Sequence, residues 1–303
     1  MIAGRDKAED RGAIKRYKVE HLTRYRYSQN VSLSQHFLHL MPRNTPSQHV
    51  ESSRITVEPL PATRRENNDY FGNATCLISI DEEHTETQVF AQSEVAVARQ
   101  PPPEPDATPV WEDVAADINA ARSKDALFIQ QYCYSSPQTQ SDKARSLAQR
   151  FFKPGVPILQ AALALIDHIY RSYNYDPEAT TIATPVDEVM RIKSGVCQDF
   201  AHLALAALRS VRLPARYVSG YLLTHPPEGQ QRLQGADASH AWLSIWAGAH
   251  GWIDLDPTNN IIPSDEHITV AWGRDYGDVS PINGVTFGGG EHDVDVEVDV
   301  LPL

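Results

Sequence analysis

The chain has 303 residues, of which 41% are apolar and 22% are charged. This composition excludes a fibrous or largely disordered chain, and the length is sufficient for two domains that each bury a hydrophobic core. The 39 acidic residues outnumber the 27 basic ones and give a formal net charge of -12. Because this charge repels phosphate backbones, we expect no nucleic-acid partner.

The sequence gives no sign of export or of insertion into a membrane. Residues 1–19 lack the apolar core of a signal peptide, and no apolar run of the sequence is long enough to cross a bilayer. We therefore expect a cytoplasmic protein with no membrane partner.

The cysteines are Cys76, Cys133 and Cys197. They are odd in number and widely spaced, which is not the pattern of a disulfide framework. At least one of the three thiols therefore needs an explanation of its own.

Short strand-like segments dominate residues 17–97, and several of them alternate apolar and polar residues as half-buried antiparallel strands do. We predict a β-rich, sandwich-like N-terminal domain over residues 14–99. Residues 100–109 contain five prolines, which disfavour both helices and sheet ladders. We interpret this stretch as a linker to a second domain at 110–303.

The second domain begins with helical patterns and then returns to strands. Helical windows lie at 111–121 and 141–152, and the apolar spacing of 158–175 predicts a largely buried helix. Strand-like runs follow at 215–223, 240–246 and 251–256. This order predicts a mixed α+β domain rather than alternating βαβ units.

Cys197 lies where a glycine-containing loop is expected to enter a helix. Apolar residues after it recur with helical spacing and form one stripe: Phe200, Leu203, Ala204, Ala207, Leu208 and Val211. The positive end of a helix dipole and the free backbone N–H groups favour a thiolate at this position and can hold an oxyanion. The alternative is a small buried apolar residue, the more common role of a cysteine.

The segment 240–257, HAWLSIWAGAHGWIDLDP, is typical of a β-hairpin. A loop centred on Gly248 places His240 directly opposite Asp256, and opposed Cβ atoms lie about 5 Å apart. Asp254 shares their face and is a rival partner for His240. The other face is apolar and should meet the core through Ala241, Leu243, Ile245, Ile253 and Leu255.

These residues together suggest a catalytic triad. An imidazole held by a carboxylate keeps the right tautomer and is stabilised when protonated, so Cys197 would be the nucleophile, His240 the base and Asp256 the orienting group. The alternative interpretation is that the histidine and the acid pair only to stabilise the hairpin.

Four segments in this order, GVCQDFAHL, PARYVSGY, ASHAW and GWIDLDPTN, resemble the bacterial transglutaminase-like cysteine enzymes. The resemblance implies the same triad and prefers Asp256 over Asp254. It also implies an α+β fold in which a papain-like or transglutaminase-like domain packs a catalytic cysteine, at a helix N-terminus, on an antiparallel sheet. HLTRYRYS, LMPR and DYFGN resemble the N-terminal region of this bacterial subgroup, and residues 266–285 resemble its C-terminal continuation.

The resemblance implies chemistry through a thioester. We expect hydrolysis of peptide or glutamine-like amides, with a peptide or protein as substrate. The alternatives are transfer of the acyl group to an amine, which would cross-link proteins, or a binding module without turnover.

We expect no cofactor and no metal ion, because the sequence has no CxxC or HxxxH pair. The C-terminal run 292–303 alternates acids with valines and predicts a strand with a solvated acidic face. Arg274, Asp275 and Asp278 are interpreted as structural ion pairs rather than cleft residues, while Asn174 and Tyr175 stay open as cleft candidates.

Overall fold

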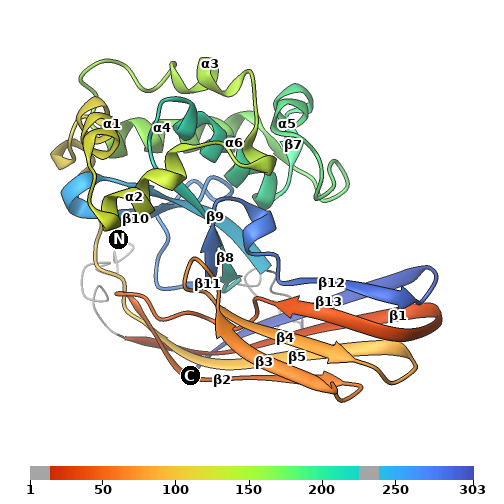
Figure 1. Ribbon diagram of the computed structural model, residues 1–303. Helices are drawn as coiled ribbons and strands as arrows, with labels where there is room; N and C mark the ends of the chain where they lie inside the picture. Colours follow the sequence, from red (N-terminus) through yellow and green to blue (C-terminus); the bar gives the residue numbers. More distant parts are fainter. Residues whose placement is uncertain (1–13, 225–238) are drawn as a thin grey trace, which may run out of the picture.

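The computed structural model describes residues 14–224 and 239–303. Helices cover one face of a four-stranded sheet, and a seven-stranded sheet lies on its other side (Figure 1). The fold is therefore mixed α+β, with a strand-rich N-terminal part, as the sequence predicts.

The seven-stranded sheet is built around one long strand. Its strands are β1 (Lys15–Leu38), β2 (Gln48–Glu58), β3 (Thr63–Asn68), β4 (Ala74–Ile80), β5 (His84–Val97), β12 (Ile282–Gly288) and β13 (His292–Pro302). The 24-residue β1 pairs with β5 and β4 along one edge and with β13 and β12 along the other, always antiparallel. Residues from β1, β2, β4 and β5 enclose a core that contains Ile55, Ile78 and Val89.

The last two strands join this first sheet, although the sequence grouped residues 110–303 with the second domain. Val298 and Val300 of β13 are buried, and so is Asp299 on the acidic face. Asp293, Asp295 and Glu297 are exposed, so the predicted solvated acidic face is confirmed for these three acids and is wrong for Asp299. The boundary at 100–109 itself stays a prediction.

The four-stranded sheet has the order β10-β9-β8-β11 and is antiparallel throughout. Its strands are β8 (Ala215–Leu222), β9 (Ser239–Trp246), β10 (Trp252–Leu255) and β11 (His267–Gly273). A short parallel pair, β6 (Asn174–Tyr175) and β7 (Ser194–Gly195), lies just before the helix that begins at Cys197.

Six α-helices are described, and most of them form the layer above the four-stranded sheet: α1 (Trp111–Ala120), α2 (Lys124–Gln130), α3 (Ala144–Ala148), α4 (Ile158–Ser172), α5 (Val186–Ile192) and α6 (Cys197–Ser210). The predicted windows correspond to α1, α3 and α4, whereas α2 and α5 were not anticipated. The central helix, α6, is buried on every side from Asp199 to Arg209. Its apolar stripe, including Leu203 and Leu208, belongs to the same core as the predicted apolar face of the hairpin.

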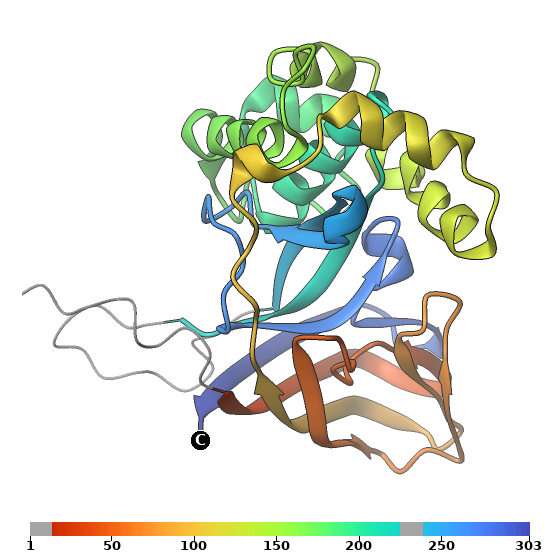
Figure 2. The ribbon, with the colours of Figure 1, turned by 90° about the vertical axis from the view of Figure 1, so that its left-hand side faces the viewer.

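The segment between the two sheets runs from the end of β5 up to the helices (yellow in Figure 2). It contains one turn of 3-10 helix, Pro105–Ala107, and is otherwise irregular. Side chains also join the two parts directly: His21 Nδ1 lies 2.8 Å from the Tyr221 hydroxyl, and Gln48 Nε2 donates to the Thr269 carbonyl. None of the helices in the described ranges is long and apolar enough to cross a membrane.

Candidate active site

Cys197 is the first residue of α6, as the sequence predicts. Asp199 fixes this helix end, because its Oδ2 accepts from the backbone N–H of Val196 at 2.8 Å and from the Thr180 hydroxyl at 2.6 Å. A Cβ at Gly195 would lie 2.6 Å from the same carboxylate oxygen, so only glycine allows this approach. The thiol therefore lies at the positive end of a buried, well-fixed helix.

The hairpin that carries the other two predicted residues has a register different from the predicted one. Trp246 pairs with Trp252 and Leu243 with Leu255, so the hairpin is centred one residue later than Gly248 and Asp256 does not lie directly opposite His240. The loop closes through a hydrogen bond from the Ala247 N–H to the Gly251 carbonyl. Gly248 and Gly251 both adopt positive φ, which lengthens the turn beyond a symmetric loop about Gly248.

A loop centre that is shifted by one residue changes each residue's partner by two positions. The same side chains therefore stay on the same face of the hairpin. His240 and Asp256 are therefore still neighbours, with His240 Nε2 2.8 Å from Asp256 Oδ2. They meet as diagonal rather than directly opposed residues, within the reach of a long side chain. The predicted contact is confirmed, although the predicted register is wrong.

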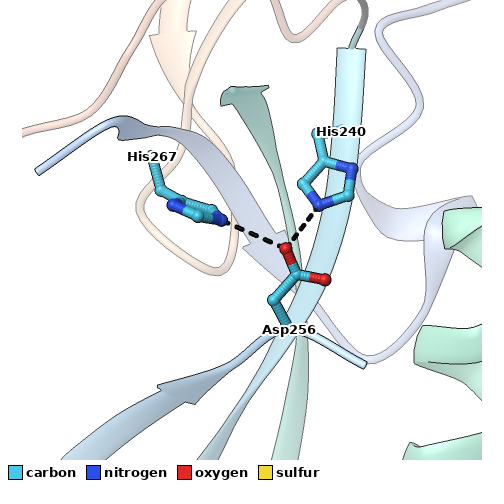
Figure 3. Close-up of side chains that lie close together, drawn as sticks. All are labelled: His240, Asp256 and His267. Carbon is cyan, nitrogen blue, oxygen red and sulfur yellow. Dashed lines mark hydrogen bonds and ion pairs between the residues drawn. The ribbon is translucent and has the colours of Figure 1, made fainter. Parts of the chain in front are cut away.

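Asp256 is the centre of a hydrogen-bond network and is fully buried (Figure 3). Its Oδ2 accepts from His240, from His267 Nε2 at 3.1 Å and from Asn259 Nδ2 at 2.7 Å. Its Oδ1 accepts from the backbone N–H groups of Thr258 and Asn259, in the manner of an Asx turn. The carboxylate is thus held by donors on both oxygens.

The pKa values of the two histidines in this network shift in opposite directions. Burial lowers the pKa of His240, but the hydrogen bonds to Asp256 and to Cys197, and their negative charges, outweigh it and raise that pKa to about 10. Burial also lowers the pKa of His267, and Asp256 does not overcome it. Burial alone would raise the pKa of Asp256, but the bonds from His240 and His267 hold it well below its usual range. The network thus favours the charged form of His240 and the neutral form of His267, which donates to Asp256.

The Cys197 side chain lies beside His240 and is one of its hydrogen-bond partners. Because Nε2 of His240 is occupied by Asp256, Nδ1 is the nitrogen left for the sulfur. Two tyrosines also lie near the sulfur, Tyr175 of β6 and the buried Tyr217 of β8, and the pKa of both is raised, chiefly by burial. Tyr175, an open cleft candidate in the sequence, is 59% exposed next to the thiol.

Sequence reasoning missed His267 and Asn259. His267 opens strand β11, eleven residues after Asp256, and reaches it because β11 pairs with β8 beside the hairpin. A histidine at the start of an otherwise apolar strand was the available signal. Asn259 lies inside the GWIDLDPTN segment, and its place three residues after an aspartate is a common turn position.

The other predicted candidates lie elsewhere. Asp254 does not contact His240, since it pairs with Arg99 Nη1 at 2.7 Å and accepts from the Ser244 hydroxyl. Arg274 and Asp278 form an i,i+4 ion pair at 2.8 Å, and Asp275 caps the turn Tyr276–Asp278, in agreement with a structural role. Asn174 pairs with Ser194 through its backbone.

His240, Asp256 and His267 also form a group whose nitrogen and oxygen atoms lie within 4.8 Å of one another, a spacing that could hold a metal ion. The Asp256 oxygens already accept hydrogen bonds from five donors. A cation here would have to displace the bonds that hold His240. We therefore interpret the group as a hydrogen-bond network, and the absence of a metal stays a prediction.

Comparison with known families identifies the family of this chain. The family model of the bacterial transglutaminase-like N-terminal region matches residues 17–96, and that of the transglutaminase-like superfamily matches residues 145–257. The chain belongs to the transglutaminase-like superfamily. The resemblance read from the sequence is thereby confirmed, and Cys197, His240 and Asp256 all lie within the matched core of this transglutaminase-like protein.

Relatives at similar length include an uncharacterized protein of Mycobacterium tuberculosis, 38% identical over 293 residues that cover 95% of this chain and 93% of the relative. An uncharacterized protein of Mycobacterium leprae is 33% identical over 95% of this chain and 99% of its own. A protein-glutamine gamma-glutamyltransferase of Pseudomonas aeruginosa is 31% identical over 108 residues, 33% of this chain and 16% of that protein.

One solved structure shares the whole fold. The crystal structure of a Cytophaga hutchinsonii protein described as a "Putative Cysteine Protease" has a TM-score of 0.75 at 24% sequence identity. The match covers 96% of this chain and 91% of that protein. Both parts of the transglutaminase-like chain, the strand-rich N-terminal part and the core, thus occur together in another protein.

Proposed function

We propose that this protein is a cysteine hydrolase that cleaves peptide or glutamine-like amides through a thioester, with Cys197, His240 and Asp256 as its catalytic triad. The observation that carries the proposal is the imidazole of His240, which Asp256 holds on one side while the Cys197 thiol lies on the other. Nucleophile, base and orienting group then act in sequence.

In the first step, the Cys197 sulfur attacks the carbonyl carbon and the carbonyl electron pair moves onto oxygen. The backbone N–H of Cys197, at the start of α6, is the oxyanion donor that we assign. His240 passes its Nδ1 proton to the nitrogen of the leaving amine, the C–N bond breaks, and a thioester remains. Asp256 keeps Nε2 hydrogen-bonded throughout and orients the ring.

In the second step, neutral His240 takes a proton from water, and the hydroxide attacks the thioester. The carbon–sulfur bond breaks, the carboxylic acid leaves, and the thiolate and imidazolium are restored. We favour water over an amine as the acceptor because Cys197 is only partly buried and Tyr175 beside it is exposed, which leaves the thioester open to solvent.

Transfer to an amine is the second candidate. It is favoured by the similarity to the Pseudomonas aeruginosa protein-glutamine gamma-glutamyltransferase, which is confined to about a third of this chain. Both candidates share the thioester and differ only in the acceptor. A binding module without turnover is disfavoured by the intact network around Asp256.

The deciding experiment measures ammonia or amine release from a glutamine-containing peptide library by the wild-type protein and by Cys197→Ala, with and without a primary amine. Cys133→Ala, which removes a buried thiol elsewhere, is the matched control and should keep the wild-type rate. We expect release that requires Cys197 and leaves a free acid even when amine is present. Amine incorporation would establish the transferase, and release unaffected by Cys197→Ala would refute the triad.

A further inference from the structure

A large cavity lies on the face of the four-stranded sheet that is turned away from α6. Its volume is about 770 Å³, within the range of small-molecule sites. Its walls come from the segment after β5, from the loop that follows β1, and from strands β8 to β11. Neither Cys197 nor His240 lines it, so the cavity is separate from the candidate active site.

The cavity contains a guanidinium group held between two indole rings. The Arg216 guanidinium carbon lies 3.6 Å from the centroid of Trp272 and 4.4 Å from that of Trp252. Arg43 lies 3.3 Å from the same Trp272 ring. Stacking holds the planar faces of Arg216, and the N–H groups in the plane are those with which arginine binds a carboxylate or a phosphate.

Hydrogen-bond donors in this cavity lack partners. Arg216 is only 8% exposed, and its buried Nε has no acceptor among the described residues. The buried Nε atoms of Arg43 and Arg99 and the Trp272 indole nitrogen are likewise without an acceptor in that part of the chain. An unsatisfied buried donor costs about 1–3 kcal/mol, and more when it is charged. The guanidiniums beside the cavity therefore keep hydrogen-bonding capacity that the described residues do not fill.

The charge of the lining is also unbalanced. Three arginines line the cavity, and Asp254 is the one acid among its described lining residues. Arg99 forms an ion pair with Asp254 at 2.7 Å. The charge of Asp254 also acts on Arg216, at longer range. Arg43 donates to the Phe71 carbonyl and to Asn73, and Asp69 attracts it from outside the cavity. Burial lowers the pKa of Arg216 to about 10, which still leaves it cationic at neutral pH.

We propose that this cavity binds a small organic anion, with a carboxylate or phosphate head group on Arg216 and an aromatic or apolar body among the tryptophans. The indole rings of Trp246 and Trp252 and the side chains of Phe71 and Phe128 supply the apolar wall. The chain as a whole carries a net charge of -12, so a cationic cavity stands out against the rest of the molecule. This site is additional to the proposed triad and does not depend on it.

Isothermal titration calorimetry with phenyl phosphate and with phenylacetate tests the proposal, and benzyl alcohol is the neutral counterpart. We expect at least one aromatic anion to bind the wild-type protein with a Kd below about 1 mM, and the stronger of the two identifies the head group. Arg216→Met keeps an apolar contact between the indoles but removes the charge, and should weaken binding at least about tenfold. Arg150→Met, which removes an arginine near the exposed side of α4, should leave the Kd unchanged.

Anions that bind no better than benzyl alcohol, or equal binding by wild type and Arg216→Met, would overturn the proposal. If circular dichroism shows that Arg216→Met does not fold, Arg43→Met takes its place with the same expectation. Titration of the wild-type protein at increasing salt concentration is an independent test. Salt should weaken the binding of the anion and leave the binding of the alcohol unchanged. Anion binding that does not change with salt would also contradict the site.

Discussion

Two polar sites share the strands of the four-stranded sheet, and their buried charges are arranged in opposite ways. Around Asp256, one carboxylate accepts hydrogen bonds from two histidines, an asparagine side chain and two backbone N–H groups. In the cavity, Asp254, two residues earlier on the chain, is the one acid among the described lining residues, which include three arginines.

The hydrogen bonds of the Asp256 carboxylate are complete, whereas buried donors beside the cavity lack acceptors among the described residues. A fully hydrogen-bonded carboxylate holds His240 in one orientation and stabilises its charge, which is what proton transfer to and from a nucleophile requires. A cluster of stacked guanidiniums with unpaired donors is suited to receiving a ligand that brings the missing acceptors. One strand, β10, and its continuation to Asp256 thus contribute both to the candidate active site and to the proposed anion site.

Replacement of the central carboxylate should have the largest effect. In Asp256→Asn, the amide cannot stabilise the His240 cation, so we expect turnover to fall by about 10²- to 10⁴-fold and the pKa of His240 to fall from about 10 toward its usual value. The basic limb of the pH–rate profile should therefore move to lower pH. Asp254→Asn is the comparison on the same face: it should alter anion binding in the cavity and leave that limb in place. A basic limb that moves in Asp254→Asn and not in Asp256→Asn would reverse the assignment.

Removal of the second histidine should have a smaller effect. His267→Phe takes away one donor to Asp256 but leaves those of His240 and Asn259, so we expect kcat to fall about tenfold, about 1.4 kcal/mol, with little change in KM. His267→Gln, whose amide can still donate, should recover part of the loss. Steady-state kinetics on a peptide that the wild-type protein cleaves checks both variants. A change in KM alone would contradict a positioning role for His267.

The same network should appear in the pH dependence of folding. The pKa of His240 is raised in the folded state, so its stabilising contribution is complete below about pH 6.5 and is lost as pH rises through about 10. Asp256 has a lowered pKa, and its contribution is lost as the pH falls below about 4. Urea unfolding should show a loss of a few kcal/mol on the basic side, at roughly 1.4 kcal/mol per pKa unit. In Asp256→Asn this loss should largely disappear, and an unchanged pH dependence would contradict the charged His240.

Chelation should have the smallest effect. If His240, Asp256 and His267 act through hydrogen bonds, dialysis against EDTA should leave the rate within about twofold, and added Zn²⁺ should inhibit by occupying their nitrogen and oxygen atoms. Loss of activity in EDTA that zinc restores would instead make this group a metal site.

The residues of the candidate triad could be singled out from sequence because each lies in a local pattern: a helix start for Cys197 and one hairpin for His240 and Asp256. The family resemblance, not the hairpin pattern, preferred Asp256 over Asp254. The register could not be predicted, since it depends on the two glycines of positive φ in the loop. His267 was missed because its contact with Asp256 comes from the pairing of β11 with β8, a long-range feature. The cavity combines segments from Arg43 to Trp272, so no local pattern indicates it.

The most direct test of the central claim is the labelling of the three cysteines by iodoacetamide at about pH 6, located by mass spectrometry. Burial raises the pKa of Cys76, and that of Cys133 to about 11, so both should stay unlabelled. Cys197, paired with the His240 cation, should be labelled alone, and His240→Ala should slow this labelling at least about tenfold. Equal labelling of all three thiols, or labelling of Cys197 that does not respond to His240→Ala, would contradict a thiolate–imidazolium nucleophile.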